Sequence, residues 1–321
     1  MGPAALRLFR IHGPAASRPH LCAPRTKRGY AMQIVRARTA GFCMGVSLAL
    51  QTLDKALLSY TEEQSPVPDG RRIITYGPII HNPQVLEEYE ARGVLCTERL
   101  NDIRTGDAVI IRAHGIPRQA ESALLERGAI LRDATCPKVK KAQLAIRKAT
   151  QTGQVLLLYG EEDHPEVKGL VSYAAGEVHV FDSFGELLKQ TLRPEASYVL
   201  AAQTTQDLTE FERIAAWVEE HFPQTPVLHT ICDATRMRQD EALSIASQVE
   251  AMVVVGGKTS GNTRRLAQLA EERGVKTWHV EMPEELPGDI LSHARIIGLT
   301  AGASTPRSQI DETQQFLESL G

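Results

Sequence analysis

The stretch Asp133-Ala-Thr-Cys136-Pro137 stands between an apolar run of strand length and a segment whose apolar residues have helical spacing. Two other cysteines occupy the same position between a strand-like run and a helical segment, in Ala40-Gly-Phe-Cys43-Met-Gly45 and Thr230-Ile-Cys232-Asp233. The three cysteines are 93 and 96 residues apart. A recurring spacing of this kind indicates a fold built from similar units, so we expect three related units after residue 31.

Within each unit, short apolar runs alternate with segments of helical period. Ile73–Tyr76 precedes a helical segment at residues 85–91, and Met252–Val255 precedes one at residues 264–273. This alternation indicates an α/β fold with parallel sheets. We expect three small parallel-sheet α/β domains in a pseudo-threefold trefoil, with the N-terminal strand 32–42 packing against the third domain. The expected domains are residues 32–130, 131–226 and 227–321.

Polar residues follow further strands at matching places in the three units. The next strand after each cysteine ends at His81, His164 or Ser260, and a later strand ends at His114, Thr204 or Ser304. In parallel sheets, ligands bind beyond the carboxyl ends of the strands. We therefore expect the three cysteines and the six polar residues to surround one central cavity.

The composition excludes several classes of protein. The 321 residues include 36 Lys and Arg against 39 Asp and Glu, a net charge of −3, which does not favour nucleic acid as a partner. No apolar run approaches the roughly 20 residues of a membrane helix. The five cysteines include no closely spaced pair, which argues against a disulfide scaffold and for a reducing compartment. These features predict a bacterial cytoplasmic protein that binds neither nucleic acid nor membrane.

Residues 1–31 differ from the rest of the chain, because they are rich in arginine and the first acidic residue is Asp54. Such a beginning is typical of an organelle transit segment, which would direct the protein to a plastid. The alternative is an upstream start codon, since Met32-Gln-Ile-Val35 has the pattern of a natural first strand. In both cases we expect a poorly ordered extension.

Three thiolates that converge from three domains suit a soft metal. Structural zinc is held by four ligands, usually in closely spaced pairs, and this sequence has no such pairs. Cys43, Cys136 and Cys232 therefore favour one [4Fe–4S] cluster per chain, with three cysteine ligands and one iron open for substrate. We interpret Cys22 and Cys96 as packing residues.

The polar residues that follow the strands form a pattern suited to phosphate oxygens, because histidines, hydroxyl groups and helix N-termini bind anions. Gly257-Lys258-Thr259 resembles the end of a nucleotide-binding P-loop, but Met252 stands where that motif needs glycine. Glu166 is the carboxylate of the His164-Pro-Glu motif and a candidate proton donor, with Thr204 as a relay. The alternative is a helix N-terminal carboxylate that only complements the helix dipole.

In combination, these motifs resemble the 4-hydroxy-3-methylbut-2-enyl diphosphate reductase family over nearly all of residues 32–312. The resemblance rests on Gly41-Phe-Cys43-x-Gly45-Val46, Ile80-His81-Asn82, Ala113-His114-Gly115, Asp133-Ala-Thr-Cys136-Pro137, His164-Pro-Glu166-Val167, Gln203-Thr204-Thr205, Ile231-Cys232-x-Ala234-Thr235, Ser260-x-Asn262 and Thr300-Ala-Gly-Ala-Ser304.

The resemblance implies a role for each matching residue. Cys43, Cys136 and Cys232 would hold the [4Fe–4S] cluster, while Glu166, Thr204 and His164 would serve catalysis by proton delivery. Gly261 stands where some members have a serine, so its backbone N–H would replace a hydroxyl contact. The substrate would be bound, chiefly through its diphosphate, by His81, His114, His164, Ser260, Gly261, Asn262 and Ser304, with Thr204 as a further substrate-binding residue.

The implied reaction is the reductive dehydroxylation of 4-hydroxy-3-methylbut-2-enyl diphosphate to isopentenyl and dimethylallyl diphosphates, the last step of the methylerythritol phosphate pathway. Its electrons would come from an external donor of the ferredoxin or flavodoxin type, because no flavin or dinucleotide fingerprint is present in the sequence. Two alternatives remain at this point: another three-cysteine open-cluster enzyme such as quinolinate synthase, and a non-enzymatic iron–sulfur sensor. Neither requires the histidines, Glu166 and the Ser/Asn residues together.

Overall fold

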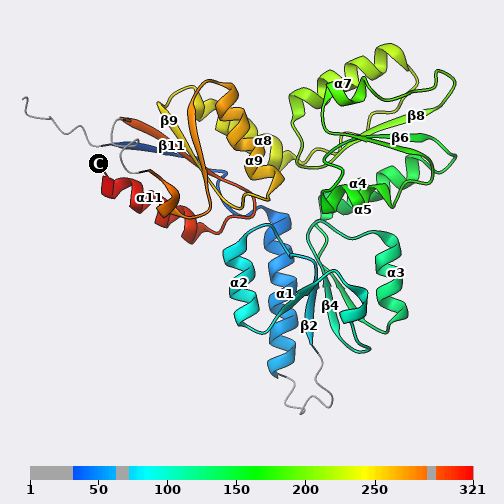
Figure 1. The fold of residues 1–321 in the computed structure, drawn as a ribbon, viewed down its shortest axis with the longest axis horizontal. Coiled ribbons are helices and arrows are strands. Elements are labelled where there is room, and N and C mark those ends of the chain that lie inside the picture. The colour runs from blue at the N-terminus through cyan, green and yellow to red at the C-terminus, as the bar shows by residue number, and fades with distance from the viewer. Residues whose placement is uncertain (1–31, 63–71, 288–293, 321) are drawn as a thin grey trace, which may run out of the picture. The chain divides into compact units, whose positions relative to one another are not determined.

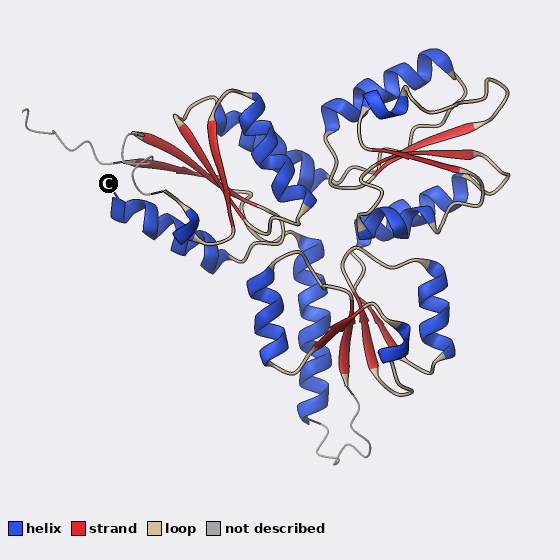
Figure 2. Ribbon diagram, in the orientation of Figure 1, coloured by secondary structure: helices blue, strands red, loops and turns tan. Residues whose placement is uncertain are grey.

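The computed structural model describes residues 32–62, 72–287 and 294–320. Their strands form three sheets in which all strand pairs are parallel, and helices cover both faces of each sheet (Figure 2). This arrangement confirms the predicted α/β class with three small parallel-sheet domains, which we call the first, second and third lobes. The extension of residues 1–31 lies outside the described part. No helix within that part is long and apolar enough to cross a membrane.

The first lobe consists of α1 (Met44–Glu62), β2 (Ile73–Tyr76), α2 (Pro83–Ala91), β3 (Leu95–Thr97), β4 (Ala108–Ile111), α3 (Arg118–Glu126) and β5 (Ile130–Asp133), with a short 3-10 helix at Leu100–Asp102. Its sheet has the order β3-β2-β4-β5, and Figure 1 shows α1 and α2 on one side of it and α3 on the other. Alternate residues of a strand face opposite sides of the sheet. Ile73 and Ile110 therefore pack against α1 and α2, while Ile74 and Val109 pack on the face that α3 covers.

The second lobe consists of α4 (Pro137–Ala149), β6 (Val155–Tyr159), α5 (Pro165–Val171), β7 (Val178–Phe181), α6 (Phe184–Leu187), β8 (Tyr198–Ala202) and α7 (Leu208–His221). Its sheet has the order β7-β6-β8. The run of five apolar or aromatic residues in β6 is buried on both faces. Leu157 packs with α6 and α7, and Leu156 packs with α4 and α5.

The third lobe consists of β1 (Gln33–Arg36), α8 (Asp233–Ala246), β9 (Ala251–Val255), α9 (Gly261–Glu272), β10 (Lys276–Val280), β11 (Ile296–Ala301) and α11 (Arg307–Leu320), with a short 3-10 helix at Pro283–Glu285. Its sheet has the order β1-β11-β9-β10, so the N-terminal strand pairs with β11. Val253 packs towards α11, while Met252 and Val254 pack towards α8 and α9.

A cysteine stands at each place where the chain passes from one lobe to the next. Cys43 follows β1 of the third lobe and precedes α1 of the first. Cys136 follows β5 and precedes α4 of the second lobe, and Cys232 precedes α8 of the third. Because β5 pairs with β4 through Asp133, the first sheet extends past the boundary expected at residues 130–131.

Candidate active site

One cavity is lined by residues from all three lobes, beyond the carboxyl ends of their strands. It includes every residue that the sequence analysis assigned to catalysis or to ligand binding. These residues are Cys43, Cys136, Cys232, His81, His114, His164, Glu166, Thr204, Ser260, Gly261, Asn262 and Ser304.

The three cysteines of the cavity stand directly before helices. Cys136 and Cys232 are the N-terminal caps of α4 and α8, and Cys43 precedes the first residue of α1. All three are half-buried and free of disulfide bonds. Burial raises the pKa of the Cys136 thiol, and the charges of Cys43 and Cys232 raise it further. Three thiols that lie within electrostatic reach of one another form a donor set for a soft metal.

Local contacts restrict where the sulfur atoms of Cys136 and Cys43 can lie. A Cβ atom at Gly45 would lie 2.4 Å from Cys136 Sγ, so a side chain there would displace the sulfur. The backbone N–H of Val46 lies 3.5 Å from Cys43 Sγ, and such helix N-terminal N–H groups stabilise thiolates. The donor set therefore fits an iron–sulfur group with three thiolate ligands. Cys96 is exposed in β3, so its interpretation as a packing residue is wrong, and Cys22 lies outside the described residues.

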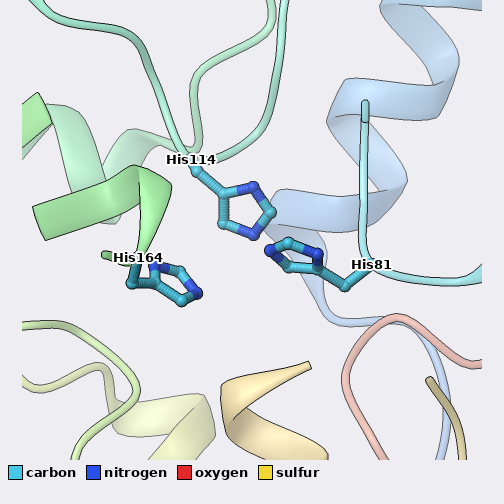
Figure 3. Close-up of side chains that lie close together, drawn as sticks. All are labelled: His81, His114 and His164. Carbon is cyan, nitrogen blue, oxygen red and sulfur yellow. The ribbon is translucent and has the colours of Figure 1, made fainter. Parts of the chain in front are cut away.

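Three histidines from the first and second lobes meet in the cavity (Figure 3). The ring centroid of His81 lies 4.5 Å from that of His114 and 5.5 Å from that of His164, and the His114 and His164 centroids are 5.4 Å apart. Nε2 of His81 and Nδ1 of His114 are buried without a hydrogen-bond partner among the described residues. Since buried polar atoms are normally paired, these two nitrogens are suited to a polar ligand.

All three histidines are neutral at pH 7. Burial, followed by the charges of Arg112 and Arg264, lowers the pKa of His81 to about 4. Burial also lowers the pKa of His164 to about 3, and that of His114 to well below its ordinary value. One ring nitrogen from each histidine lies within 4.8 Å of one from each of the other two, a spacing that three ligands of one metal ion can have. The two nearby guanidinium groups favour an anion there instead of a cation.

Helix capping determines the tautomer of His164. Its Nδ1 accepts a hydrogen bond from the backbone N–H of Glu166 at 3.1 Å, which caps α5. A neutral imidazole that accepts at Nδ1 carries its proton on Nε2. His164 therefore offers an N–H donor at Nε2.

The N-terminal end of α9 supplies a further side of the cavity. Ser260 caps this helix by accepting the N–H of Thr263 at 3.4 Å, and Nδ2 of Asn262 is buried without a partner among the described residues. Ser304 donates to the backbone carbonyl of His81 at 2.9 Å, which ties the third lobe to the first. The free N–H groups and the positive dipole end of a helix favour an anion.

Glu166 and Thr204 form a buried pair. Glu166 is 1% exposed. Its carboxyl group accepts two hydrogen bonds from Thr204. Burial raises the pKa of Glu166 to about 7, although both hydrogen bonds act in the opposite direction. A carboxyl group with this pKa is still partly protonated near neutral pH, which is the property of a general acid.

Three residues that contribute to this site were not predicted from the sequence. Arg112 is buried and pairs with Glu98, Arg264 pairs with Glu161, and Thr205 lines the cavity. Each lies in or next to a quoted motif, which is a signal that could have drawn attention to it. Proximity in sequence does not show where a long side chain points, and arginines beside motifs are usually solvated.

The sequence model described as LytB protein matches residues 34–318. The 4-hydroxy-3-methylbut-2-enyl diphosphate reductase of Nitratidesulfovibrio vulgaris (strain DP4) is 57% identical over 290 residues, covering 90% of this chain and all of the relative. The protein of the same name from Geotalea daltonii is 39% identical and covers 90% of this chain and 98% of its own.

Two solved structures are similar to this one. The E-1-hydroxy-2-methyl-but-2-enyl-4-diphosphate reductase of Plasmodium falciparum has a TM-score of 0.80 at 28% identity, covering 90% of this chain and 87% of its own. A second structure, described as (E)-4-hydroxy-3-methyl-but-2-enyl diphosphate reductase, the terminal enzyme of the non-mevalonate pathway, has a TM-score of 0.61 at 36% identity. It covers 90% of this chain and 99% of its own.

Proposed function

Because this chain belongs to the LytB protein family, we propose that it reduces (E)-4-hydroxy-3-methylbut-2-enyl diphosphate to isopentenyl and dimethylallyl diphosphates in isoprenoid biosynthesis. The observation that carries the proposal is the convergence of three thiols, three neutral histidines and one proton-holding carboxyl group on a single cavity. An iron–sulfur sensor would need the thiols but neither the histidines nor the acid. We further infer a cytoplasmic location, or a plastid one if residues 1–31 are a transit segment.

Cys43, Cys136 and Cys232 would hold a [4Fe–4S] cluster in which one iron has no protein ligand. When bound, the cluster supplies electrons and a Lewis acid for the departing hydroxyl group. The electrons originate from an external carrier of the ferredoxin or flavodoxin type, since the sequence has no flavin or dinucleotide fingerprint. The half-buried placement of the three thiols supports this assignment.

The diphosphate would bind between the histidines and the start of α9. His164 donates from Nε2, because its Nδ1 is occupied by helix capping, and Asn262 donates from its free Nδ2. The backbone N–H of Gly261 adds a donor from the first residue of the helix. Each hydrogen bond to a charged oxygen contributes about 1.5–3 kcal/mol, so neutral histidines suffice as donors.

Glu166 is the proton donor of the proposed reaction. The Thr204 backbone N–H can only donate, so Oε1 of Glu166 must accept and the acidic proton resides on Oε2. The Thr204 hydroxyl lies 2.9 Å from Oε2 and can rotate to accept from it. Glu166 thus holds the proton until the substrate's hydroxyl group takes it and leaves as water. Two electrons and a second proton, which forms the new C–H bond, complete the balance.

Anaerobic purification and turnover test this proposal. We expect about four irons and four sulfides per chain, and reduction of the hydroxylated diphosphate when dithionite and a viologen supply electrons. Serine in place of Cys43, Cys136 or Cys232 should abolish the visible absorption and turnover, while Cys96→Ser should retain both. A fully loaded wild-type protein that leaves this substrate unchanged would contradict the proposed function.

A further inference from the structure

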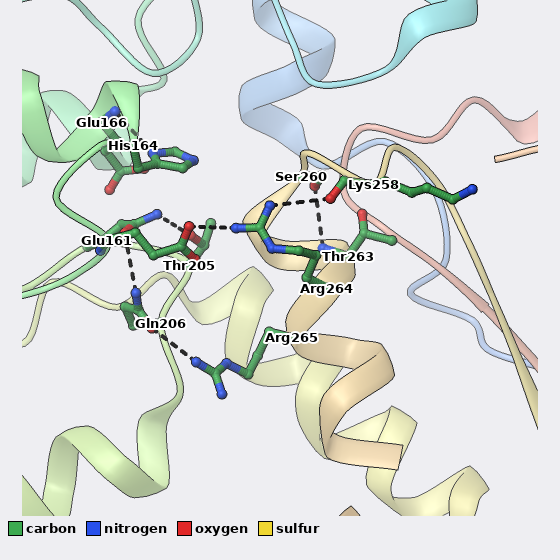
Figure 4. Close-up of polar contacts among 11 residues, drawn as sticks. Glu161, His164, Glu166, Thr205, Gln206, Lys258, Ser260, Thr263, Arg264 and Arg265 are labelled. Atoms are coloured by element: carbon green, nitrogen blue, oxygen red, sulfur yellow. Dashed lines mark hydrogen bonds and ion pairs between the residues drawn. The ribbon is translucent and has the colours of Figure 1, made fainter. Parts of the chain in front are cut away.

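Glu161 and Arg264 form an ion pair between the second and third lobes, beside the cavity (Figure 4). Arg264 Nη2 lies 2.5 Å from Glu161 Oε2, and the two side chains are 35% and 39% exposed. Glu161 stands three residues before His164, and Arg264 stands in the first turn of α9, two residues after Asn262. The pair therefore joins the two chain segments that supply opposite sides of the anion site.

Arg264 also braces the beginning of its own helix. Its Nη1 donates to the carbonyl oxygen of Lys258 at 3.3 Å, and its backbone N–H donates to that of Ser260 at 3.0 Å. The guanidinium group thus connects the loop before Ser260 with a carboxylate of another lobe. A planar guanidinium with fixed N–H directions can serve both partners at once, which the single ammonium group of lysine does less well.

Glu161 is in turn fixed to the loop after β8. Its backbone N–H donates to Oε1 of Gln203 at 3.0 Å, and Nε2 of Gln203 donates to the Thr205 hydroxyl at 3.1 Å. Gln206 donates to the same Gln203 oxygen at 3.3 Å. Since Gln203 is fully buried, the segment that carries Glu161 is anchored to the loop after β8, which also carries Thr204.

Gly261 lies where these segments approach each other. A Cβ atom at this residue would be 3.6 Å from both Glu161 Oε1 and Thr205 Oγ1, which are ordinary contact distances. The first residue of α9 therefore rests against the second lobe. The position of its backbone N–H depends on how the two lobes are held together at this point.

An ion pair with this much exposure contributes little to folding stability. Its main effect should be on the relative position of the two chain segments that it joins. We propose that the Glu161–Arg264 pair is a positioning element, which holds the N-terminal end of α9 against the His164–Glu166 segment in the arrangement that binds a diphosphate. This inference rests on the proposed function. Arg264 acts here through the helix it fixes.

Neutral variants of both partners test the inference. In Arg264→Gln and in Glu161→Gln, we expect the KM for the hydroxylated diphosphate to rise about tenfold with kcat within about twofold, because only binding geometry changes. The double variant should be no worse than either single one, as residues that act through one contact are not additive. Arg273→Gln, which removes an arginine at the other end of α9, is the matched control and should leave KM unchanged.

Isothermal titration with inorganic pyrophosphate separates this inference from the proposed function, since it needs no electrons. The Kd of pyrophosphate should rise about tenfold in both single variants, with melting temperatures close to that of the wild type. A lower KM and Kd in Glu161→Gln would show that Glu161 merely neutralises the charge of Arg264, and would overturn the proposal. An unchanged Kd in Arg264→Gln would overturn it as well. If the wild type fails to reduce the substrate, the proposed function fails while the titration still decides the inference.

Discussion

Thr204 donates two hydrogen bonds to Glu166, from its backbone N–H to Oε1 at 2.6 Å and from its hydroxyl group to Oε2 at 2.9 Å. The first bond orients the carboxyl group, because an N–H cannot reverse its role as donor. The second involves a hydroxyl group, which can donate to the carboxylate or accept from the carboxylic acid. The pair can therefore hold Glu166 in one position in both protonation states, which a proton donor requires.

Glu166→Gln should bind substrate with near-normal affinity and turn over about 10²–10⁴ times more slowly, since the amide keeps the shape but has no acidic proton. The cluster absorption should remain. Steady-state kinetics and a spectral titration with substrate measure the two effects in one preparation. Wild-type turnover in this variant would remove Glu166 from the proton-donor role.

The same variant separates catalysis from helix stabilisation. The pKa of Glu166 is raised to about 7, so the folded protein holds this proton more tightly than the unfolded chain does, and the stability this provides is lost as pH rises from about 4.5 through 7. At pH 8 Glu166→Gln should melt at a higher temperature than the wild type, with the difference disappearing near pH 5. A carboxylate that only complements the dipole of α5 predicts the reverse at pH 8.

Thr204→Val should shift the pH dependence of turnover. The wild-type rate should fall as pH rises through about 7, because the proton of Glu166 is then lost. The Thr204 hydroxyl lowers the pKa of Glu166. Its removal should therefore raise this pKa and move the fall in rate to higher pH. Thr205→Val is the matched control, since Thr205 hydrogen-bonds with Gln203. The loss of its hydroxyl group should leave the pH at which the rate falls unchanged.

His81→Asn should raise the KM for the hydroxylated diphosphate about ten- to hundredfold, the effect of losing one charge-assisted hydrogen bond. The iron content should be unchanged, because His81 lies among the anion-binding residues. His221→Asn, at the exposed end of α7, is the control. An unchanged KM in His81→Asn would exclude this histidine from the diphosphate site.

Gly45→Ala should lose most of its iron and its visible absorption although it changes no ligand, because the added Cβ would lie 2.4 Å from Cys136 Sγ. Gly185→Ala provides the comparison, since a Cβ there meets no heavy atom of the described residues within 4 Å. Full iron occupancy in Gly45→Ala would show that the Cys136 thiol can move without consequence.

The sequence determined the α/β class, the three related units and the residues that surround the cavity. These features were predictable because they follow from local patterns: apolar runs make parallel strands, and the residues just after them lie beyond the carboxyl ends of the sheet. The resemblance read from motifs such as His164-Pro-Glu166 is confirmed by the family match. Residue roles within the cavity remain predictions.

Only the tertiary structure decided how charge is distributed in the site. Neutral histidines and a proton-holding Glu166 result from burial by segments far apart in the chain, and burial of a polar group cannot be read from its neighbours in sequence. The placement of Cys43, Cys136 and Cys232 at the crossovers between lobes depends likewise on which sheet each following helix covers. The Glu161–Arg264 pair joins residues 103 positions apart, because the direction of a long side chain depends on tertiary contacts.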